Sequence, residues 1–407
     1  MMRHENLGSK IREVLEKELM IAHVVGYGMI DGLGNNPAEC YKNFINDLDF
    51  VTDLEFFVNG KITRGIKADQ KAVMLPNGFS DTGITRTQRL AIHATAQALE
   101  HANLPHSTNV AVLISTVAND SECLEELYPR FLENRRVSPR TVVSRLPDLA
   151  CNQVASHYGF LGVSYALFAS CSTGLMSIDC ALKLLEEYDY VVVGAADAGC
   201  FKFSMKYFAA INALGNSSTP FDDAREGFCM GEGAGTLILQ SPEKSKEYSS
   251  TVYATLYPVG MASDAHDATS PHNDGRGAIL AMDKAMKHVD SIHAINAHAT
   301  STPIGDEVEY RILTNKFPNI PIYAPKSKIG HTLGASGILE TIYAIEAMRH
   351  GVIPHIHNFK SSAFLKPEGK LNLTPTDFGS DKTLRTLKNS FGFGGKCASM
   401  VIEVTRE

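Results

Sequence analysis

Short runs of β-branched residues alternate with helical stretches through most of the chain, and this alternation most strongly constrains the fold. The strand-like run 109–115 (NVAVLIS) precedes a helical stretch at 121–134, and the run 190–196 (YVVVGAA) follows another at 175–187. Strands that alternate with helices are typical of α/β proteins, whose sheets are buried and mostly parallel. The sequence therefore predicts an α/β fold.

The chain has 407 residues, more than one ordinary domain of about 100–200 residues, so we expect two units or one large layered fold. A net charge of -7 without blocks of like charge argues against a nucleic-acid-binding protein, and no apolar run approaches the roughly 20 residues that cross a bilayer. The 8 cysteines include no C-x-x-C pair, and the first residues have no apolar segment typical of a signal peptide. We therefore expect free thiols in a reducing cytoplasm.

Three parts can be distinguished along the chain. Residues 1–20 include apolar side chains at helical spacing, which predicts an N-terminal helical extension. Residues 21–250 carry a loop with a cysteine, and residues 251–407 carry two loops with histidines. Because no low-complexity linker separates these two larger parts, they are expected to be two halves of one fold.

Cys171 lies in a short polar segment between a predicted strand and a predicted helix. Residues 169–174 read ASCSTG, and leucines and isoleucines at three- and four-residue spacing follow. The free N–H groups and positive dipole end of a helix favour a thiolate, so this position predicts a nucleophilic cysteine. A free cysteine is also a common core residue, and that interpretation fits Cys180 in the same helix better.

His298 lies in a second strand-to-helix loop. It follows a short apolar strand and precedes a helix for which Thr302 is the expected cap, with Asp306 and Glu309 three residues apart on that helix. A lone histidine in a loop is most often a solvated or capping residue. Its interpretation depends on what the other loops contain.

Lys326 and His331 lie in a third loop of this kind. Gly334, Ala335 and Gly337 follow, and so little side-chain bulk at the start of a helix is typical of close contact with another backbone. A single lysine here would be interpreted as a surface residue. Three reactive residue types at three strand-to-helix loops nevertheless indicate a site, because ligands of α/β proteins bind where strands give way to helices.

Other segments are less specific. Residues 389–397 (NSFGFGGKC) predict either a tight turn or a flexible gate beside a pocket. The segments 26–28 and 231–235 resemble nucleotide loops, but Asp31 replaces the last glycine of the first and the second lacks the Walker lysine. We therefore expect no nucleotide cofactor, and no metal, since the cysteines and histidines show no clustered ligand spacing.

Together these segments resemble the elongating β-ketoacyl-[acyl carrier protein] synthases of the thiolase-like superfamily. The resemblance covers essentially residues 21–404, and its motifs follow the family's order: ASCSTG at 169–174, PFDDAREGFCMGEGAG at 220–235, SDAHDATSP at 263–271, NAHATSTPIGD at 296–306, KSKIGH at 326–331 and NSFGFGG at 389–395. It implies a five-layered αβαβα sandwich of two similar halves. It also implies a homodimer, or a heterodimer with a homologous subunit.

The resemblance implies a decarboxylative Claisen condensation, in which an acyl group held on a cysteine joins a malonyl-[acyl carrier protein]. By motif position, Cys171 would be the nucleophile, and His298 and His331 would bind the malonyl thioester, promote loss of CO2 and stabilise the enolate. Lys326, paired with an acidic residue that matches Asp306, would organise His298. The phosphopantetheine arrives on the acyl carrier protein, and no further cofactor is implied.

Supporting roles also follow from the resemblance. Backbone N–H groups of Cys171 and Phe393 would form an oxyanion hole, and Phe393 would gate the passage between malonyl pocket and acyl channel. Thr300 and Thr302 match threonines that bind the pantetheine arm, and Glu340 matches a buried structural glutamate.

The expected carrier-protein docking residues are Arg86 and Arg89, while Asn212 stands where the family often has another arginine. Further departures are Ser170 before the nucleophile, Ala299 after the first histidine and the segment 115–120 (STVAND) near the expected acyl pocket. They leave the reaction type in place but leave two pathways open, fatty acid elongation and a specialised polyketide or polyene pathway.

Three related classes fit the residues less well. A non-catalytic partner subunit that sets chain length would lack the nucleophile that Cys171 supplies. A degradative thiolase would need a second catalytic cysteine, for which Cys397 is the candidate. A chain-initiating synthase would carry asparagine at the position of His331.

Overall fold

The computed structural model describes residues 20–58, 61–69, 71, 73–77, 79, 83–366 and 369–406. The expected helical extension over residues 1–20 lies outside the described residues, except for Met20. Within the described ranges, no helix has the length and apolarity that crossing a membrane requires. The free thiols expected from the sequence are present at the described cysteines Cys40, Cys151, Cys171, Cys180, Cys200, Cys229 and Cys397.

The main strands of the first half follow the order β5 (Ser164–Tyr165), β4 (Val110–Ser115), β6 (Tyr190–Ala198), β7 (Met230–Gln240) and β1 (Ala22–Asp31). The pairs β5–β4 and β4–β6 are parallel, whereas β6–β7 and β7–β1 are antiparallel. Strands β4, β6 and β7 are buried along their whole length, which explains why their sequences are mostly apolar.

The second half repeats this order with β11 (Pro321–Tyr323), β10 (Ala294–Asn296), β15 (Thr383–Gly392), β16 (Lys396–Thr405) and β8 (Ala254–Leu256). Again the first two pairs are parallel and the last two antiparallel. The pair β8–β1 joins the two sets into one continuous sheet. The sequence predicts mostly parallel pairing, and the difference arises because strands such as β15 and β16 are joined by a tight loop that reverses the chain.

Shorter strands lie at the margins: β2 (Thr52–Val58) pairs with β3 (Lys61–Ile66), which reaches β7; β9 (Gly260–Ser263) pairs with β16; β13 (Lys370–Leu371) pairs with β11; and β12 (Val352–Ile353) pairs with β14 (Thr376–Asp377). Besides the six helices described in the next two paragraphs, the described residues form α2 (Pro37–Phe44), α4 (Asn119–Glu126), α5 (Tyr128–Leu132), α6 (Pro139–Val143), α9 (Lys202–Ala210), α10 (Pro242–Glu247) and α13 (Lys326–Ile329). Short 3-10 turns are η2 (Ser170–Ser172), η3 (Met286–His288) and η4 (Leu333–Ala335).

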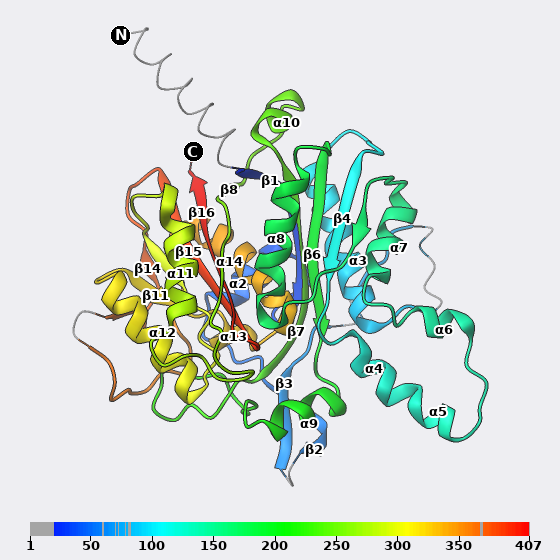
Figure 1. The fold of residues 1–407 in the computed structure, drawn as a ribbon, viewed down its shortest axis with the longest axis horizontal. Coiled ribbons are helices and arrows are strands. Elements are labelled where there is room, and N and C mark those ends of the chain that lie inside the picture. The colour runs from blue at the N-terminus through cyan, green and yellow to red at the C-terminus, as the bar shows by residue number, and fades with distance from the viewer. Residues whose placement is uncertain are drawn as a thin grey trace.

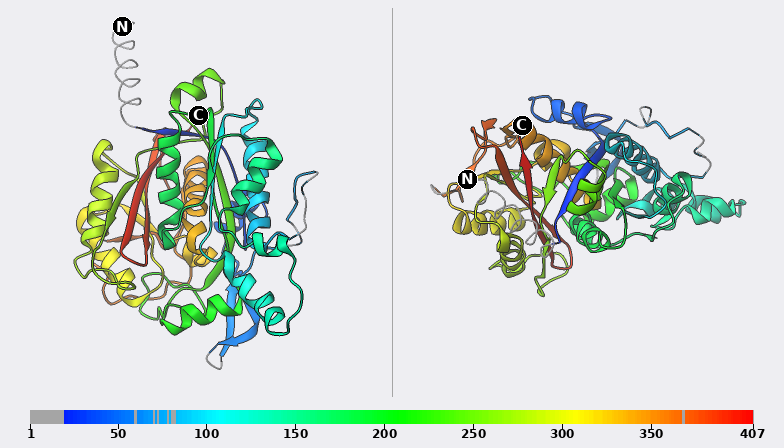
Figure 2. Two further views of the ribbon diagram at one scale, coloured as in Figure 1. Left: turned by 45° about the vertical axis from the view of Figure 1, so that its right-hand side comes forward. Right: turned by 90° about the horizontal axis from the view of Figure 1, so that it is seen from above.

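Helices form three layers around the two half-sheets (Figures 1 and 2). The central layer consists of α8 (Thr173–Leu184) and α14 (Ser336–His350), which contact each other and strands of both halves. On one outer face, α3 (Arg86–Ala102) contacts β1, β7 and β6, with α7 (Leu149–Tyr158) beside it on β4. This arrangement gives the first half-sheet a helical layer on both sides.

The other outer face is covered by α11 (Arg276–Ala285) and α12 (Pro303–Lys316), whose apolar side chains share one core with β10, β11 and β15. The layers thus follow the order α, β, α, β, α, and the predicted fold class is confirmed. The expected boundary between residues 250 and 251 falls in the connection between α10 and β8, where one half-sheet gives way to the other.

The two central helices touch backbone to backbone where they cross. A Cβ atom built on Gly174 would lie 2.7 Å from the Ile338 nitrogen and 2.8 Å from the Gly337 Cα, and a Cβ on Gly337 would lie 2.7 Å from the Leu175 nitrogen. Neither glycine has room for a methyl group, because the obstructing atoms belong to the main chain. The close contact expected from the small residues before α14 is confirmed.

We predict that Gly337→Ala destabilises the protein although alanine is the better helix former. Helix propensity alone would add about 1 kcal/mol, whereas forcing α8 and α14 apart is expected to lower the free energy of unfolding by about 1–3 kcal/mol. Urea unfolding followed by circular dichroism measures the difference. Gly305→Ala in α12 is the matched control, since its new methyl group would meet the rotatable Thr302 hydroxyl. Equal stability changes in both variants would contradict the prediction.

Candidate active site

Cys171 lies on a sharp turn that leads into α8. The turn is η2, and Ser170 just before the cysteine has a φ of 52°, a left-handed conformation that costs a non-glycine residue about 1–2 kcal/mol. The Ser172 hydroxyl donates to the carbonyls of Ser390 (3.0 Å) and Lys396 (2.8 Å), which ties the turn to the β15–β16 hairpin. The strained turn is thus fixed from the second half of the molecule.

His331 lies directly against the Cys171 sulfur. Its Nε2 is 3.1 Å from Cys171 Sγ, and its Nδ1 is 3.0 Å from the Ser336 hydroxyl. The main chain of His331 is fixed as well, since its N–H donates to the Cys229 carbonyl at 2.8 Å. Phe228 packs edge-on against the imidazole, with ring centroids 4.9 Å apart. The histidine is 1% exposed, so its ring is held on all sides.

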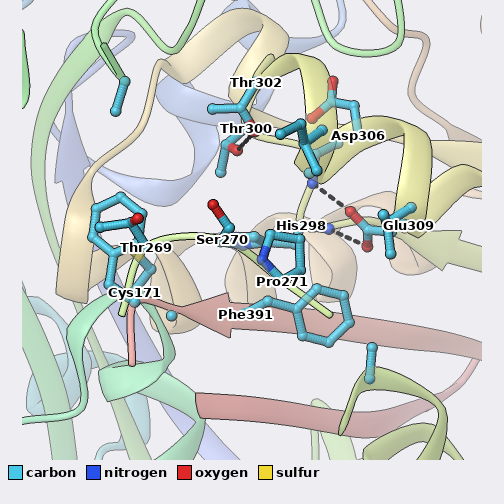
Figure 3. Close-up of a pocket in the computed structure, with 18 of the residues that line it drawn as sticks. Cys171, Thr269, Ser270, Pro271, His298, Thr300, Thr302, Asp306, Glu309 and Phe391 are labelled. Carbon is cyan, nitrogen blue, oxygen red and sulfur yellow. Dashed lines mark hydrogen bonds between the residues drawn. The ribbon is translucent and has the colours of Figure 1, made fainter. Parts of the chain in front are cut away.

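His298 supplies a second imidazole, with its ring centroid 5.7 Å from that of His331. Lys326 Nζ lies 3.4 Å from His298 Nδ1, so the ammonium donates to this nitrogen and leaves the proton of the neutral ring on Nε2. The loop is positioned by Glu309, whose carboxylate accepts the N–H groups of His298 (2.8 Å) and Ala299 (2.7 Å), as Figure 3 shows. Sequence analysis assigns no function to Glu309.

The partner of Lys326 differs from the expected one. Lys326 Nζ pairs with Glu340 Oε1 at 2.6 Å, whereas Asp306 accepts the N–H of Phe221 at 2.8 Å. The expected pairing of Lys326 with Asp306 is therefore wrong. Asp306 lies in the first turn of α12 and holds the neighbouring loop, while Glu340 reaches Lys326 from α14.

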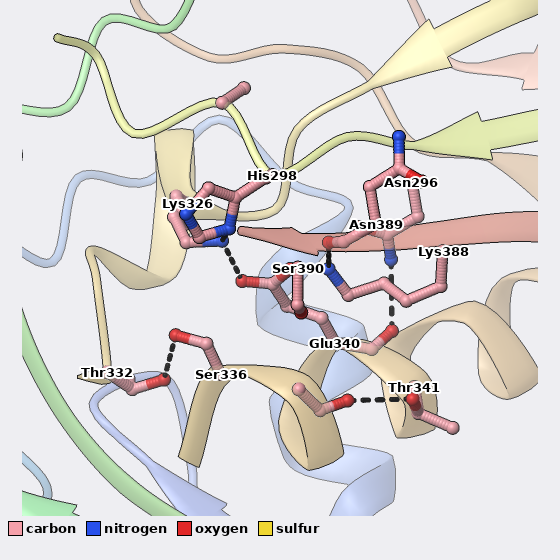
Figure 4. A network of polar contacts seen from close by, with 12 residues as sticks. Asn296, His298, Lys326, Thr332, Ser336, Glu340, Thr341, Lys388, Asn389 and Ser390 are labelled. Carbon is pink, nitrogen blue, oxygen red and sulfur yellow. Dashed lines mark hydrogen bonds and ion pairs between the residues drawn. The ribbon is translucent and has the colours of Figure 1, made fainter. Parts of the chain in front are cut away.

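Sequence analysis missed Lys388, which binds the other oxygen of Glu340 at 2.6 Å (Figure 4). Lys388 is fully buried in β15, immediately before the glycine-rich segment. The available signal is a lysine directly between Leu387 and the glycine-rich segment in a predicted strand, since lysine is almost never fully buried without a partner.

Burial sets the protonation of the site. It raises the pKa of Cys171 to about 11, and the positive charge of Lys326 offsets only part of this increase. The thiolate expected from the helix N-terminus is thus not the resting form, because removal of solvent outweighs the helix end and the nearby ammonium. Burial also lowers the pKa of both His298 and His331 well below the usual histidine range. At neutral pH the site therefore holds a thiol and two neutral imidazoles.

A cavity of about 290 Å³ opens onto these three side chains. Thr300 and Thr302 line one wall, and their hydroxyl oxygens lie 3.1 Å apart. Phe391 and Phe393 also line the cavity, together with Thr269, Ser270 and Pro271 of the 263–271 loop. Figure 3 labels Phe391 and these three loop residues around His298. The cavity combines an apolar wall and a polar wall, which suits a flexible arm that carries amide and thioester groups.

The glycine-rich segment forms the loop between β15 and β16. The Gly394 N–H donates to the Ala268 carbonyl and the Asp264 N–H donates to the Gly395 carbonyl, both at 2.7 Å, so this loop is tied to the 263–271 loop. The main-chain N–H groups of Phe393 and of Cys171 itself are directed at the Cys171 sulfur, where both help to lower the pKa of the thiol. Their role as an oxyanion hole stays a prediction, as does the gating role of Phe393.

The expected docking role of Arg86 is contradicted by its burial. Arg86 is 8% exposed, and its guanidinium binds Glu232 at 2.6 Å and the Ala68 carbonyl at 2.6 Å. Arg86 therefore joins α3 to β7 within the protein. Arg89, one turn further along α3, is half-buried, and its docking role stays a prediction.

Two clusters of the described residues have an arrangement that could hold a metal ion. The ligand atoms of Cys171, His298 and His331 lie within 4.8 Å of one another, and a second cluster joins His355, His357 and Asp47. Spacing along the sequence does not reveal either cluster, because each is assembled from distant segments. The first cluster also has the geometry of a nucleophile with two proton donors.

We predict that alkylation of Cys171 by iodoacetamide becomes about tenfold faster with each pH unit between 7 and 9.5, because the pKa of its thiol is about 11 and only the thiolate reacts. Peptide mass spectrometry measures the modification at Cys171, with Cys171→Ser as the control for modification elsewhere. A rate that has already reached its plateau at pH 7 would contradict the prediction, since it would show a stable thiolate–imidazolium pair.

Comparison with known proteins identifies the family. Residues 23–245 match the β-ketoacyl synthase N-terminal domain, and residues 253–360 match the β-ketoacyl synthase C-terminal domain. The mitochondrial 3-oxoacyl-[acyl-carrier-protein] synthase of Arabidopsis thaliana is 36% identical over 288 residues, a match that covers 66% of this chain and 62% of the Arabidopsis protein. The 3-oxoacyl-[acyl-carrier-protein] synthase 2 of Staphylococcus aureus (strain COL) is 28% identical over 406 residues, covering 93% of this chain and 97% of that protein.

Solved structures agree in fold. The ishigamide ketosynthase/chain length factor superposes with a TM-score of 0.84 at 21% identity, covering 95% of this chain and 99% of that chain. A type II polyketide ketosynthase, bound to its acyl-carrier protein and a hexaketide, superposes with a TM-score of 0.82 at 22% identity, covering 94% of this chain and 99% of that chain. The two family-model matches and these relatives show that the chain belongs to the β-ketoacyl synthase family of acyl-transferring condensing enzymes.

Proposed function

We propose that the protein is a 3-oxoacyl-[acyl carrier protein] synthase of fatty acid elongation, which condenses an acyl group on Cys171 with malonyl-[acyl carrier protein]. The observation that carries the proposal is the 3.1 Å contact between His331 Nε2 and Cys171 Sγ, beside a second imidazole whose Nδ1 is held by Lys326. A nucleophile with two neutral proton donors supplies the groups that this reaction requires.

In the first step, His331 Nε2 accepts the Cys171 proton and the sulfur attacks the acyl thioester of the carrier. A new carbon–sulfur bond forms, and the bond to the pantetheine sulfur breaks. The proton then passes from His331 to the leaving thiolate, which restores the neutral imidazole. The N–H groups of Cys171 and Phe393 stabilise the negative oxygen of the tetrahedral intermediate.

In the second step, His298 donates its Nε2–H to the carbonyl oxygen of the malonyl thioester, and His331 acts as the second donor in the tautomer that carries its proton on Nε2. Loss of CO2 leaves an enolate whose carbon attacks the acyl thioester on Cys171. The new carbon–carbon bond forms, the bond from the acyl carbon to the Cys171 sulfur breaks, and the departing thiolate takes up a proton from water to restore the thiol. A neutral imidazole that carries its proton on Nε2 donates to this oxygen, and burial keeps the pKa of His298 and His331 well below the usual histidine range, so both rings are neutral at neutral pH.

The substrate is proposed to arrive on an acyl carrier protein, which both relatives name as the carrier of their substrates. Thr300 and Thr302 present paired hydroxyl groups to the cavity and are proposed to bind the amides of the phosphopantetheine arm. The protein itself would need no other cofactor. The free thiols of the described cysteines favour a reducing compartment such as the cytoplasm.

A specialised polyketide or polyene ketosynthase is the second candidate. The solved structures of similar fold include a ketosynthase with a hexaketide and the ishigamide ketosynthase, but their identities of 22% and 21% are lower than that of the Arabidopsis enzyme. The segment 115–120 near the expected acyl channel differs from the family's usual glycine-rich sequence. The acyl specificity therefore distinguishes the two pathways.

We predict that the wild-type protein forms a covalent acyl adduct with saturated acyl carrier thioesters, and that malonyl carrier protein discharges it as a 3-oxoacyl product two carbons longer. Intact-mass spectrometry measures both steps. Cys171→Ala is expected to abolish the adduct, whereas Cys180→Ala, in the following helix, is expected to retain it. His298→Ala and His331→Ala are each expected to slow malonyl decarboxylation about 10²–10³-fold, as loss of one such donor typically does.

A panel of acyl donors decides the pathway. Preference for polyene or polyketide thioesters over saturated ones would support the second candidate. No adduct from any donor with a folded protein would contradict both proposals and indicate a subunit without activity of its own.

We also propose that two copies of the chain associate along the edge of the sheet at β5. Leu161, Val163 and Phe168 flank this short strand and are 81%, 42% and 65% exposed. A sheet edge with exposed large apolar side chains favours association with another chain. A homologous subunit is the alternative partner.

We predict that light scattering gives twice the mass of one chain for the wild type, and the mass of one chain for the double variant Leu161→Glu with Phe168→Glu, because two charges would be buried at the contact. Leu280→Glu on α11 is the matched control, since it changes a 47% exposed leucine on the opposite face. A wild-type protein with the mass of one chain would contradict the homodimer.

A further inference from the structure

Lys388 belongs to a buried ion cluster in which one carboxylate binds two lysines. Its Nζ lies 2.6 Å from Glu340 Oε2, and Lys326 Nζ lies 2.6 Å from Glu340 Oε1, with all three side chains 0% exposed. Lys388 also donates to the Asn389 carbonyl (Figure 4). One lysine suffices to neutralise Glu340, so the second adds a positive charge to the interior next to the site.

The charged groups that face Lys388 come from three helices. Glu340 lies on α14, Lys326 on α13 and Glu309 on α12, and each contributes to the electrostatic environment of the ammonium. Glu309 is itself occupied by the loop N–H groups at His298 and by the Asn389 amide (3.3 Å). Glu309 is therefore engaged with the main chain of the His298 loop, and the ammonium groups that lower the pKa of both histidines are those of Lys326 and Lys388.

We infer that Lys388 is a positioning residue: it holds Glu340 from the side opposite Lys326 and keeps a net positive charge behind His298 and His331. The catalytic consequence rests on the proposed function, whereas the electrostatic effect on the histidines is present without any reaction.

The physical effect follows from the sign of the charge. Lys326 Nζ lies 3.4 Å from His298 Nδ1 and acts on the ring directly, and the ammonium of Lys388 adds a second positive charge that the single carboxylate of Glu340 does not balance. A positive charge disfavours the imidazolium, and Lys388 contributes, after burial and Lys326, to the lowered pKa of both histidines. Both rings therefore stay neutral to a lower pH, where they still donate to a substrate carbonyl.

The test is the pH dependence of malonyl-carrier decarboxylation in Lys388→Met, Lys388→Gln and Lys388→Arg. On the acid side of the pH–rate profile, we expect the fall in rate to move to higher pH by about one unit in the two neutral variants. This acid limb is expected to stay in place in the arginine variant, which keeps the charge. Titration of the histidines by NMR on protein labelled at histidine Cε1 is the second measurement. It is expected to show the same upward shift for His298 and His331.

Lys328→Met is the matched control. Like Lys388 in β15, Lys328 in α13 is a buried lysine. It donates to the carbonyls of Asn46 and Leu48, away from the two histidines. Its loss is expected to change stability and not the acid limb. An unchanged limb and unchanged histidine titrations in both neutral Lys388 variants would overturn the inference, as would an equal shift in Lys328→Met.

Failure of the two neutral variants to fold, with a folded arginine variant, would also count against the inference, because Lys388 would then act through stability alone. A wild-type protein that does not decarboxylate malonyl carrier protein would overturn the proposed function instead. In that case the NMR titrations still decide whether Lys388 controls the histidines.

Discussion

The backbone contact between Gly174 and Gly337 determines where the reactive groups meet. Cys171 precedes α8 and His331 precedes the turn into α14, so each residue sits just before the helix that carries one of these glycines. Because the two helices cross at the van der Waals limit of their main chains, the thiol and the imidazole come within 3.1 Å of each other. A wider crossing would separate them without changing either loop.

The repeated order of strands explains why the groups come from both halves. α8 connects β5 to β6, and α14 lies between β11 and β15, so the two helices occupy equivalent places in the two half-sheets. The fold thus brings two helix N-termini to one point, one with a thiol and the other with an imidazole. The second histidine, His298, comes from the loop before α12 in the second half. The site is therefore asymmetric, although the two halves repeat the same strand order.

The sequence predicts the reactive residues better than their partners. Cys171, His298 and Lys326 are recognisable because each follows a strand and precedes a helix, which is local information. The partner of Lys326 depends instead on how α14 packs beside α13, and the pair of Arg86 with Glu232 spans 146 residues. The sequence also predicts the wrong direction for the pKa shift of Cys171. The depth of burial that raises this pKa depends on how the layers assemble and cannot be found in a local sequence pattern.

The same depth of burial gives the site its chemistry. A solvated cysteine and solvated histidines would titrate independently near their usual pKa values, and the proton would exchange with water. In the buried site the charged forms of Cys171, His298 and His331 are all disfavoured, so at neutral pH the thiol keeps its proton unless a neighbouring group accepts it. The 3.1 Å contact between Cys171 and His331 supplies that acceptor, and the fixed ammonium groups behind the rings prevent the charge from resting there. The thiol and both imidazoles therefore rest in their neutral forms at neutral pH, with a proton acceptor already in contact with the sulfur.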